Sequence, residues 1–330
     1  MLYQSTKKNR ALARGTALFG LTLASAALWA TPAYASLFTI NATFAPSITG
    51  ASNALQVEAF IAQAVSFYES IVTTPITVNI DYGEMTTGLG QSSTYYGIIT
   101  YSQYLAALTS HSSGDATDTA ALASLPAGPD NPVNGGTTVD VTTANLRALG
   151  FSANPPGADS TVLVNTSITN YAGSTFNSSY YDLLAVIEHE TDEALGLGSN
   201  IDTGNLTAAI RGEDLFRYSA PGVRSYTTSS SATSYFSING GVTDLIGFNQ
   251  AGPPGGSDYG DWVSSSTAHV QDAFGTPGAT PVFGVEKTAL DAIGYNFTSV
   301  AAIPEPSTFW LLSLGAGVLG LARLRQTRRS

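Results

Sequence analysis

The sequence predicts an α+β fold for one globular domain. Residues 53–72 and 179–199 have the apolar spacing of amphipathic helices, whereas residues 76–82 alternate apolar and polar side chains as a strand does. Residues 160–168 form a second strand-like segment, and hydrophobic residues make up 43% of the chain, enough for a sizeable core. These patterns all fall between residues 36 and 303, so we expect a single domain there.

Residues 1–35 have the features of a signal peptide. They begin with a basic stretch, continue with an apolar run at 17–30 and end at the small-residue sequence Ala33-Tyr34-Ala35. Cleavage at that point would make Ser36 the first residue of the exported protein.

Residues 304–330 have a three-part order of their own. Pro304-Glu305-Pro306 precedes an apolar run at 309–322, which a cluster of arginines follows (Arg323, Arg325, Arg328 and Arg329). The apolar run is short for a membrane span of about 20 residues, but snorkelling arginines can extend it, and their charge favours a cytoplasmic end. This tail resembles the PEP-CTERM sorting signal of Gram-negative bacteria, and a plain tail anchor is the alternative. The resemblance implies export across the inner membrane, transient anchoring there by the C-terminal helix, processing by an exosortase, and delivery to the cell surface or extracellular matrix.

The charge of the body, residues 36–303, excludes one class of partner. It contains only five basic residues against 23 acidic ones, so we expect no nucleic-acid binding, which depends on a basic surface. Cysteine is absent, so no disulfide supports the fold despite export.

Shorter elements are expected along the body in chain order. The predicted helices besides the two long ones are residues 142–149 and 285–293, the latter stopping at Gly294. A further strand is expected at 93–101, and the Asn-Gly pair within 235–241 indicates a hairpin. A polar, turn-rich region at 110–136 surrounds a short apolar piece and contains His111, which we interpret as a solvated histidine.

The helix predicted at 179–199 is the centre of the functional interpretation. Ser179 and Asp182 form a candidate capping box, and Gly196 with Gly198 gives the stop signal. One face carries the apolar side chains that should be buried (Leu183, Leu184, Ile187, Thr191, Ala194 and Leu195). His189 and Glu193 lie one turn apart on a different face beside Glu190, and Glu188 and Asp192 are expected to point into water.

The segment His189-Glu190-Thr191-Asp192-Glu193 resembles the His-Glu-x-x-His helix of zinc metallopeptidases, with glutamate in the second histidine position. Two ligands at i and i+4 can hold one zinc ion, and the intervening Glu190 can act as general base. Gly196 continues the metzincin pattern, but Ser199 stands where that family has its third ligand, and no methionine follows Met85 to form its Met-turn.

A wider resemblance covers residues 180–297. It includes Asp214-Leu215-Phe216-Arg217-Tyr218 and Asp258-Tyr259-Gly260-Asp261-Trp262. These segments are similar to those of a group of predicted bacterial metallopeptidases, many with PEP-CTERM tails, which also have glutamate in the second histidine position. The resemblance implies a single metzincin-like catalytic domain with a mixed sheet, a central active-site helix and a loop-rich C-terminal part.

The third metal ligand stays open between three residues. Asp214 is the first choice, with His269 and Glu213 as alternatives. One histidine with two carboxylates is a harder ligand set than zinc usually has, so manganese or iron is also considered. Asp258 and Asp261 could hold a structural calcium ion, although aspartates in tight turns are the commoner interpretation.

The expected function is that of an exported zinc-dependent metallopeptidase, which hydrolyses peptide bonds of a protein or peptide substrate through a metal-activated water. The alternative is a non-catalytic cell-surface or matrix protein on a degenerate peptidase scaffold. A glycosidase that uses Glu190 and Glu193 as paired carboxylates is excluded, because side chains three apart on one helix cannot flank a sugar ring from opposite sides.

Overall fold

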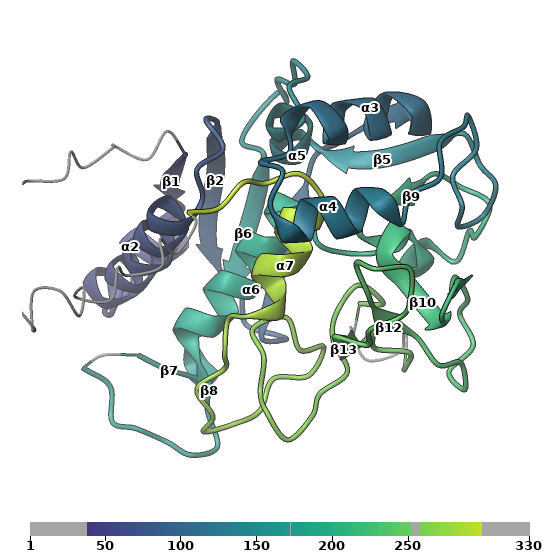
Figure 1. Ribbon diagram of the computed structural model, residues 1–330. Helices are drawn as coiled ribbons and strands as arrows, with labels where there is room; N and C mark the ends of the chain where they lie inside the picture. The colour runs from purple at the N-terminus through teal and green to yellow at the C-terminus, as the bar shows by residue number, and fades with distance from the viewer. Residues whose placement is uncertain (1–37, 172, 252–257, 299–330) are drawn as a thin grey trace, which may run out of the picture. The chain divides into compact units, whose positions relative to one another are not determined.

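The computed structural model describes residues 38–171, 173–251 and 258–298, and it confirms the α+β class (Figure 1). The expected signal peptide at 1–35 and the expected sorting tail at 304–330 lie outside the described residues. Among the described helices, none is both long and apolar enough to cross a membrane.

The larger sheet is mixed and has four strands. Its order is β1 (Thr39–Phe44), β2 (Thr77–Glu84), β6 (Ser160–Val164) and β3 (Gly90–Thr94). β1, β2 and β6 are mutually parallel, whereas β3 is antiparallel to β6 and forms one edge. Alternation in β2 places Val78, Ile80 and Tyr82 in the core and Thr77, Asn79 and Asp81 toward solvent, as the sequence predicts.

Two long helices pack against this sheet and against each other. They are α2 (Ala54–Ile71), which contacts β1, and α6 (Leu183–Leu195), which contacts β6 and β3. A one-turn helix, α1 (Pro46–Thr49), connects β1 to α2. Both helices confirm the predicted elements, and Figure 1 shows them beside the sheet. The face expected for α2, which begins with Leu55, is wrong: Leu55 is 80% exposed, and the buried side chains are Val57, Ile61, Ala64 and Tyr68.

A second, smaller sheet begins where the strand predicted at 93–101 is interrupted. The strand predicted at 93–101 is wrong as one element, because the chain leaves the first sheet at Tyr95 and begins β4 (Tyr96–Thr100) in a second sheet. β4 pairs with β5 (Thr138–Thr142), which pairs with β9 (Ile210–Arg211). The helices that accompany this sheet are α3 (Tyr101–His111), α4 (Ala116–Ala123) and α5 (Thr143–Ala148).

The C-terminal part consists mostly of loops joined by short strands. The strands are β7 (Thr169–Asn170), β8 (Tyr181–Asp182), β10 (Arg217–Ala220), β11 (Val223–Arg224), β12 (Tyr235–Phe236) and β13 (Ile246–Gly247). The predicted tight hairpin at 235–241 is wrong, because β12 pairs with β13 and β10 rather than turning back at Asn239-Gly240. The last helix, α7 (Val285–Ala292), confirms the prediction and is followed by Gly294 with φ 115°.

One expectation for α6 is corrected by its neighbour α2. Glu188 and Asp192 do not point into water: both are buried, and Asp192 is 0% exposed. The hydroxyl of Tyr68 on α2 donates to Asp192 Oδ1 at 2.7 Å and to the Glu188 carbonyl at 2.9 Å. α6 is therefore covered on two sides, which leaves the side that carries His189 to face a cavity.

Candidate metal centre

Helix α6 positions the central residues of the candidate site. It begins after Asp182, whose carboxylate accepts hydrogen bonds from Leu184 N and Ala185 N, so the cap is Asp182 and not the predicted Ser179. It ends at Gly196, whose φ of 130° suits a residue without a Cβ. Between these ends, His189 and Glu193 lie one turn apart, as the sequence predicts.

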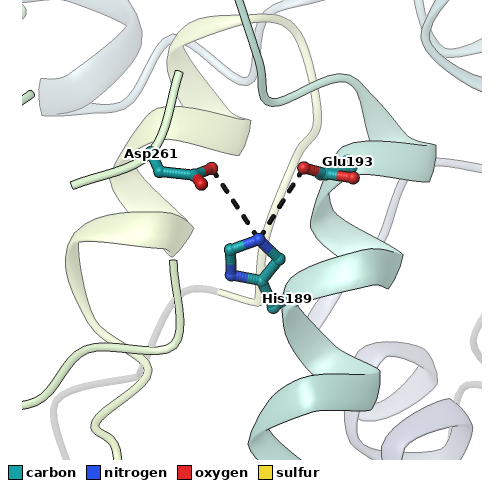
Figure 2. A group of neighbouring side chains, drawn as sticks. All are labelled: His189, Glu193 and Asp261. Atoms are coloured by element: carbon teal, nitrogen blue, oxygen red, sulfur yellow. Dashed lines mark ion pairs between the residues drawn. The ribbon is translucent and has the colours of Figure 1, made fainter. Parts of the chain in front are cut away.

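The structure brings a third residue, Asp261, to this pair (Figure 2). His189 Nε2 lies 3.7 Å from Glu193 Oε1 and 3.7 Å from Asp261 Oδ1, and one ligand atom of each residue lies within 4.8 Å of the other two. Two ligands that are each 2.0–2.2 Å from a tetrahedral ion would be about 3.3–3.6 Å apart. The two distances from His189 Nε2 therefore lie close to the spacing of ligands on a single ion of zinc's size.

A backbone hydrogen bond sets the tautomer of His189. Its Nδ1 lies 2.9 Å from the carbonyl oxygen of Val270, which can only accept, so Nδ1 is the donor. The Nε2 lone pair of the neutral ring then faces the carboxylate oxygens of Glu193 and Asp261. Three negative or electron-rich atoms that converge in this way need a cation among them, either a proton or a metal.

Both carboxylates of the trio are oriented by neighbouring side chains. Ser92 Oγ on β3 donates to Glu193 Oε2 at 2.5 Å, and Gln271 Nε2 donates to Asp261 Oδ1 at 3.0 Å. The same Gln271 nitrogen lies 3.5 Å from His189 Nε2. Such outer contacts are typical of metal sites, where they fix the direction of each ligand.

The charges around His189 favour a cation strongly. Burial lowers the pKa of His189, but Asp261, Glu193 and Glu190 outweigh it and raise that pKa well above its ordinary value. Burial also raises the pKa of Asp261, and Asp258 and Glu193 raise it further. For Glu193, burial acts upward, but its contacts with His189 and Ser92 hold the pKa below the ordinary value. These groups therefore favour positive charge at His189, from either a proton or a metal ion.

Glu190 lies beside the trio but is not one of its ligands. Its carboxyl group is buried, and Oε2 has no hydrogen-bond partner among the described residues. Burial, followed by the charge of Glu193, raises its pKa well above the ordinary value. Gly90 on β3 gives it room: a Cβ at that position would overlap Glu190 Oε1 and lie 2.9 Å from Val186 Cγ1.

All four residues line one cavity of about 760 Å³. One wall is the edge strand and the loop before it, residues 88–92, and another is the exposed side of α6. The segment around His269 and Phe274 closes a third side. The cavity is therefore large enough for several residues of an extended chain beside His189.

Asp214, predicted as the third ligand, lies elsewhere. Its Oδ1 accepts from Ser199 Oγ at 2.5 Å, and its Oδ2 accepts from Arg211 N at 2.9 Å and Asn200 N at 3.2 Å. Both oxygens are thus used to hold the turn after α6, and Asp214 does not join His189 and Glu193. Ser199, at the third-ligand position of the metzincin pattern, is its partner in that turn.

The alternatives for the third ligand are also placed apart from the trio. Glu213 Oε2 accepts a hydrogen bond from Gly198 N in the same turn. His269 lines the cavity but is not among the three converging residues, and its backbone N–H donates to Asp272 Oδ2. Asp261, which the sequence suggested only for calcium or a turn, takes the place of all three.

The calcium site suggested for Asp258 and Asp261 is not assembled. Asp258 Oδ1 accepts from Gly260 N at 2.7 Å, which is the tight-turn interaction, while Asp261 turns toward His189. His111, expected in a solvated loop, is exposed at the end of α3, where Nδ1 lies 3.0 Å from the Ala107 carbonyl.

Comparison with known proteins identifies the tail of the chain. The PEP-CTERM protein-sorting motif matches residues 302–329. No curated protein and no solved structure matches the chain significantly. The motif marks an exported protein that an exosortase recognises and sorts to the cell surface or the extracellular space.

Proposed function

We propose that this exported protein is a metal-dependent peptidase in which His189, Glu193 and Asp261 hold one divalent cation. The observation that supports this most directly is the approach of two carboxylate oxygens to His189 Nε2, each at 3.7 Å, with Nδ1 committed to a backbone carbonyl. Zinc is the first candidate, since tetrahedral sites of nitrogen and oxygen ligands suit it. Manganese and iron remain alternatives, because two of the three ligands are hard carboxylates.

Glu190 is the proposed general base. When bound, the metal would lower the pKa of a bound water and polarise a carbonyl group. Glu190 would take a proton from that water and return it to the leaving amine, and burial, which raises its pKa above the ordinary value, makes it a stronger base than a solvated carboxylate. Its Oε2 has no hydrogen-bond partner among the described residues, so no other group competes for that oxygen.

The edge strand β3 supports a peptide as the substrate. β3 is the last strand of its sheet, so the side opposite β6 has main-chain groups that an extended chain can pair with. Gly90, Gln91 and Ser92 of this strand line the cavity. A peptide that adds to β3 would therefore run past Glu190 and His189.

The experiment compares Glu190→Gln with Glu188→Gln in the purified exported protein. Glu188 lies on the same helix but does not line the cavity, so it is a matched control for the charge change. On a quenched peptide library, Glu190→Gln should lose at least about 100-fold in kcat/KM, with metal content unchanged, because general bases contribute about 10²–10⁴. Glu188→Gln should keep its activity.

Two outcomes would contradict the proposal in different ways. Equal turnover by wild type and Glu190→Gln would remove Glu190 from the mechanism. A metal-loaded wild type that cleaves no member of the library would favour the alternative of a non-catalytic surface protein on a peptidase scaffold.

A further inference from the structure

A second group of acidic side chains lies outside the cavity, between α4 and α7. One carboxylate oxygen from each of Asp115, Asp118 and Asp291 lies within 4.8 Å of the other two. Asp115 caps α4, Asp118 is in its first turn, and Asp291 is in the last turn of α7. The two helices pack against each other (Figure 1), so the group joins segments that are far apart in the sequence.

Asp291 is the residue that indicates a ligand. Asp291 is only 4% exposed, and its Oδ1 has no hydrogen-bond partner among the described residues. A buried carboxylate oxygen without a donor is costly, since desolvation is not compensated. The carboxylates of Asp115 and Asp118 lie beside it and add repulsion.

Within the described part of the chain, no cationic side chain forms a salt bridge with this group. Lys287 lies four residues before Asp291 on α7, the spacing at which a lysine and an aspartate can pair. Its ammonium group instead lies 5.3 Å from the centre of the Phe297 ring. The salt bridges of the described residues are elsewhere, at Arg147 and His189.

Each carboxylate keeps an oxygen for a cation. Asp115 uses Oδ1 to accept from Asp118 N at 3.0 Å, and Asp118 uses Oδ2 to accept from Ser113 Oγ at 2.7 Å and Gly114 N at 2.9 Å. These bonds hold the first two carboxylates in place without occupying both of their oxygens. Together with Asp291, the group offers one converging oxygen from each of three carboxylates.

The helix ends have opposing effects on a cation. The N-terminus of α4 is positive and disfavours a cation, whereas the C-terminus of α7, where Asp291 lies, is negative and favours one. These contributions are of similar size, so the three carboxylates decide the sign. Burial, with the charges of Asp115 and Asp118, also raises the pKa of Asp291 to about 8, which reflects the same crowding of negative charge.

We propose that Asp115, Asp118 and Asp291 bind a calcium ion that fastens α4 to α7. Oxygen-only ligands of flexible geometry, completed by water at the exposed Asp115, are the set that calcium accepts. The site is independent of the metal centre at His189 and of any peptidase activity. An exported protein can use a weak site of this kind, with Kd about 0.1–1 mM, as extracellular modules do.

The test is the thermal midpoint of the purified exported protein in EDTA and in 10 mM calcium. We expect calcium to raise Tm by about 3–10 °C in the wild type and in His189→Ala, from mass action at about 10–100 Kd. Asp291→Asn should lose this rise, yet stay close to the wild-type Tm in EDTA at pH 7, because a carboxyl group with its pKa raised to about 8 is largely neutral there without the ion. Asp130→Asn, an exposed residue with the same charge change, should behave as the wild type does.

A second variant guards against misfolding of the first. Asp115→Asn keeps the cap of α4, since asparagine caps as well as aspartate, but it removes one ligand charge. It should also lose most of the calcium-dependent rise. Magnesium at 10 mM controls for screening and should give a smaller shift, because it gives up its water reluctantly. No calcium effect on the wild type, an equal effect on Asp291→Asn, or an equal effect of magnesium would overturn the proposal.

Discussion

Asp159 makes the one carboxylate–guanidinium salt bridge of the described residues, and replacing it with asparagine should destabilise the fold. The side chain is 0% exposed, and its Oδ2 accepts from Arg147 Nη2 at 2.6 Å and from Asn79 N at 2.8 Å. Its Oδ1 accepts from Thr143 Oγ1 at 2.6 Å. Three donors thus converge on one carboxylate that connects β2, α5 and the start of β6.

The expected loss follows from this geometry. An asparagine amide can still accept from Arg147 and Asn79 through its oxygen, but it is neutral and no longer balances the guanidinium charge. The Arg147 side chain is 19% exposed and keeps its bonds to the Ala153 and Thr77 carbonyls, so we expect the loss of a hydrogen bond to a charged group, about 1.5–3 kcal/mol, rather than the larger cost of an isolated buried charge. For a domain of this size that corresponds to a Tm decrease of roughly 3–12 °C.

The contribution of the Asp159 charge to the free energy of unfolding should depend on pH. Burial alone would raise the pKa of Asp159, but the hydrogen bond from Arg147, with those from Asn79 and Thr143, holds it below its ordinary value of 3.8. A carboxyl group with a lowered pKa in the folded state contributes stability above its unfolded pKa and loses it as pH falls through the folded pKa.

The assay is urea denaturation of wild type and Asp159→Asn at pH 7 and at pH 3. The difference in free energy of unfolding should be full at pH 7 and smaller at pH 3, where the wild-type carboxylate begins to take up a proton. A difference below about 1 kcal/mol at pH 7 would mean that the buried pair is energetically neutral, against this reasoning. A difference that does not shrink in acid would refute the lowered pKa.

Three further predictions concern the surroundings of the metal centre. Tyr68→Phe should lose about 1–3 kcal/mol in urea denaturation, because buried Asp192 loses the hydrogen bond from the Tyr68 hydroxyl; a loss near zero would contradict that contact. Gly90→Ala should reduce peptidase kcat more than metal affinity, because its Cβ displaces Glu190; unchanged kcat would contradict the proposed role of that carboxylate. Glu286→Gln should weaken metal binding about 10–100-fold in a competition titration. The Glu286 carboxylate accepts hydrogen bonds from Trp262, which follows Asp261, and from the backbone N–H groups of Gln271 and Gly284, so it holds these three loop segments together. Unchanged affinity would show that this support is not needed.

The elements that the sequence predicts well are those with a local pattern. The apolar period of α2 and α6 and the glycine after α7 depend only on neighbours within two turns, so they could be recognised without a structure. The break at Tyr95 could not, because which sheet a strand joins depends on pairing with residues far along the chain.

In the candidate site too, the residues that share a helix could be predicted from the sequence, whereas the residue from a distant loop could not. His189 and Glu193 come together because they share a helix, and their spacing alone predicts it. Asp261 arrives from a loop that is positioned by Asn249, which donates its backbone N–H to the Asp261 carbonyl at 2.7 Å, and by Gln271. In the sequence, the segment around Asp261 shows only aspartates and glycines, a composition that turns share, so the sequence favours Asp214 as the third ligand.

The central claim is tested most directly by metal analysis of the purified exported protein. Mass spectrometry should find about one divalent ion per chain in the wild type and in Asp214→Asn, since Asp214 is used in a turn. His189→Ala and Asp261→Asn should lose more than the roughly 100-fold in affinity that outer contacts cost, with circular dichroism confirming that each variant is folded. Full metal retention in folded Asp261→Asn, or its loss in folded Asp214→Asn alone, would contradict the assignment of His189, Glu193 and Asp261 as the metal centre.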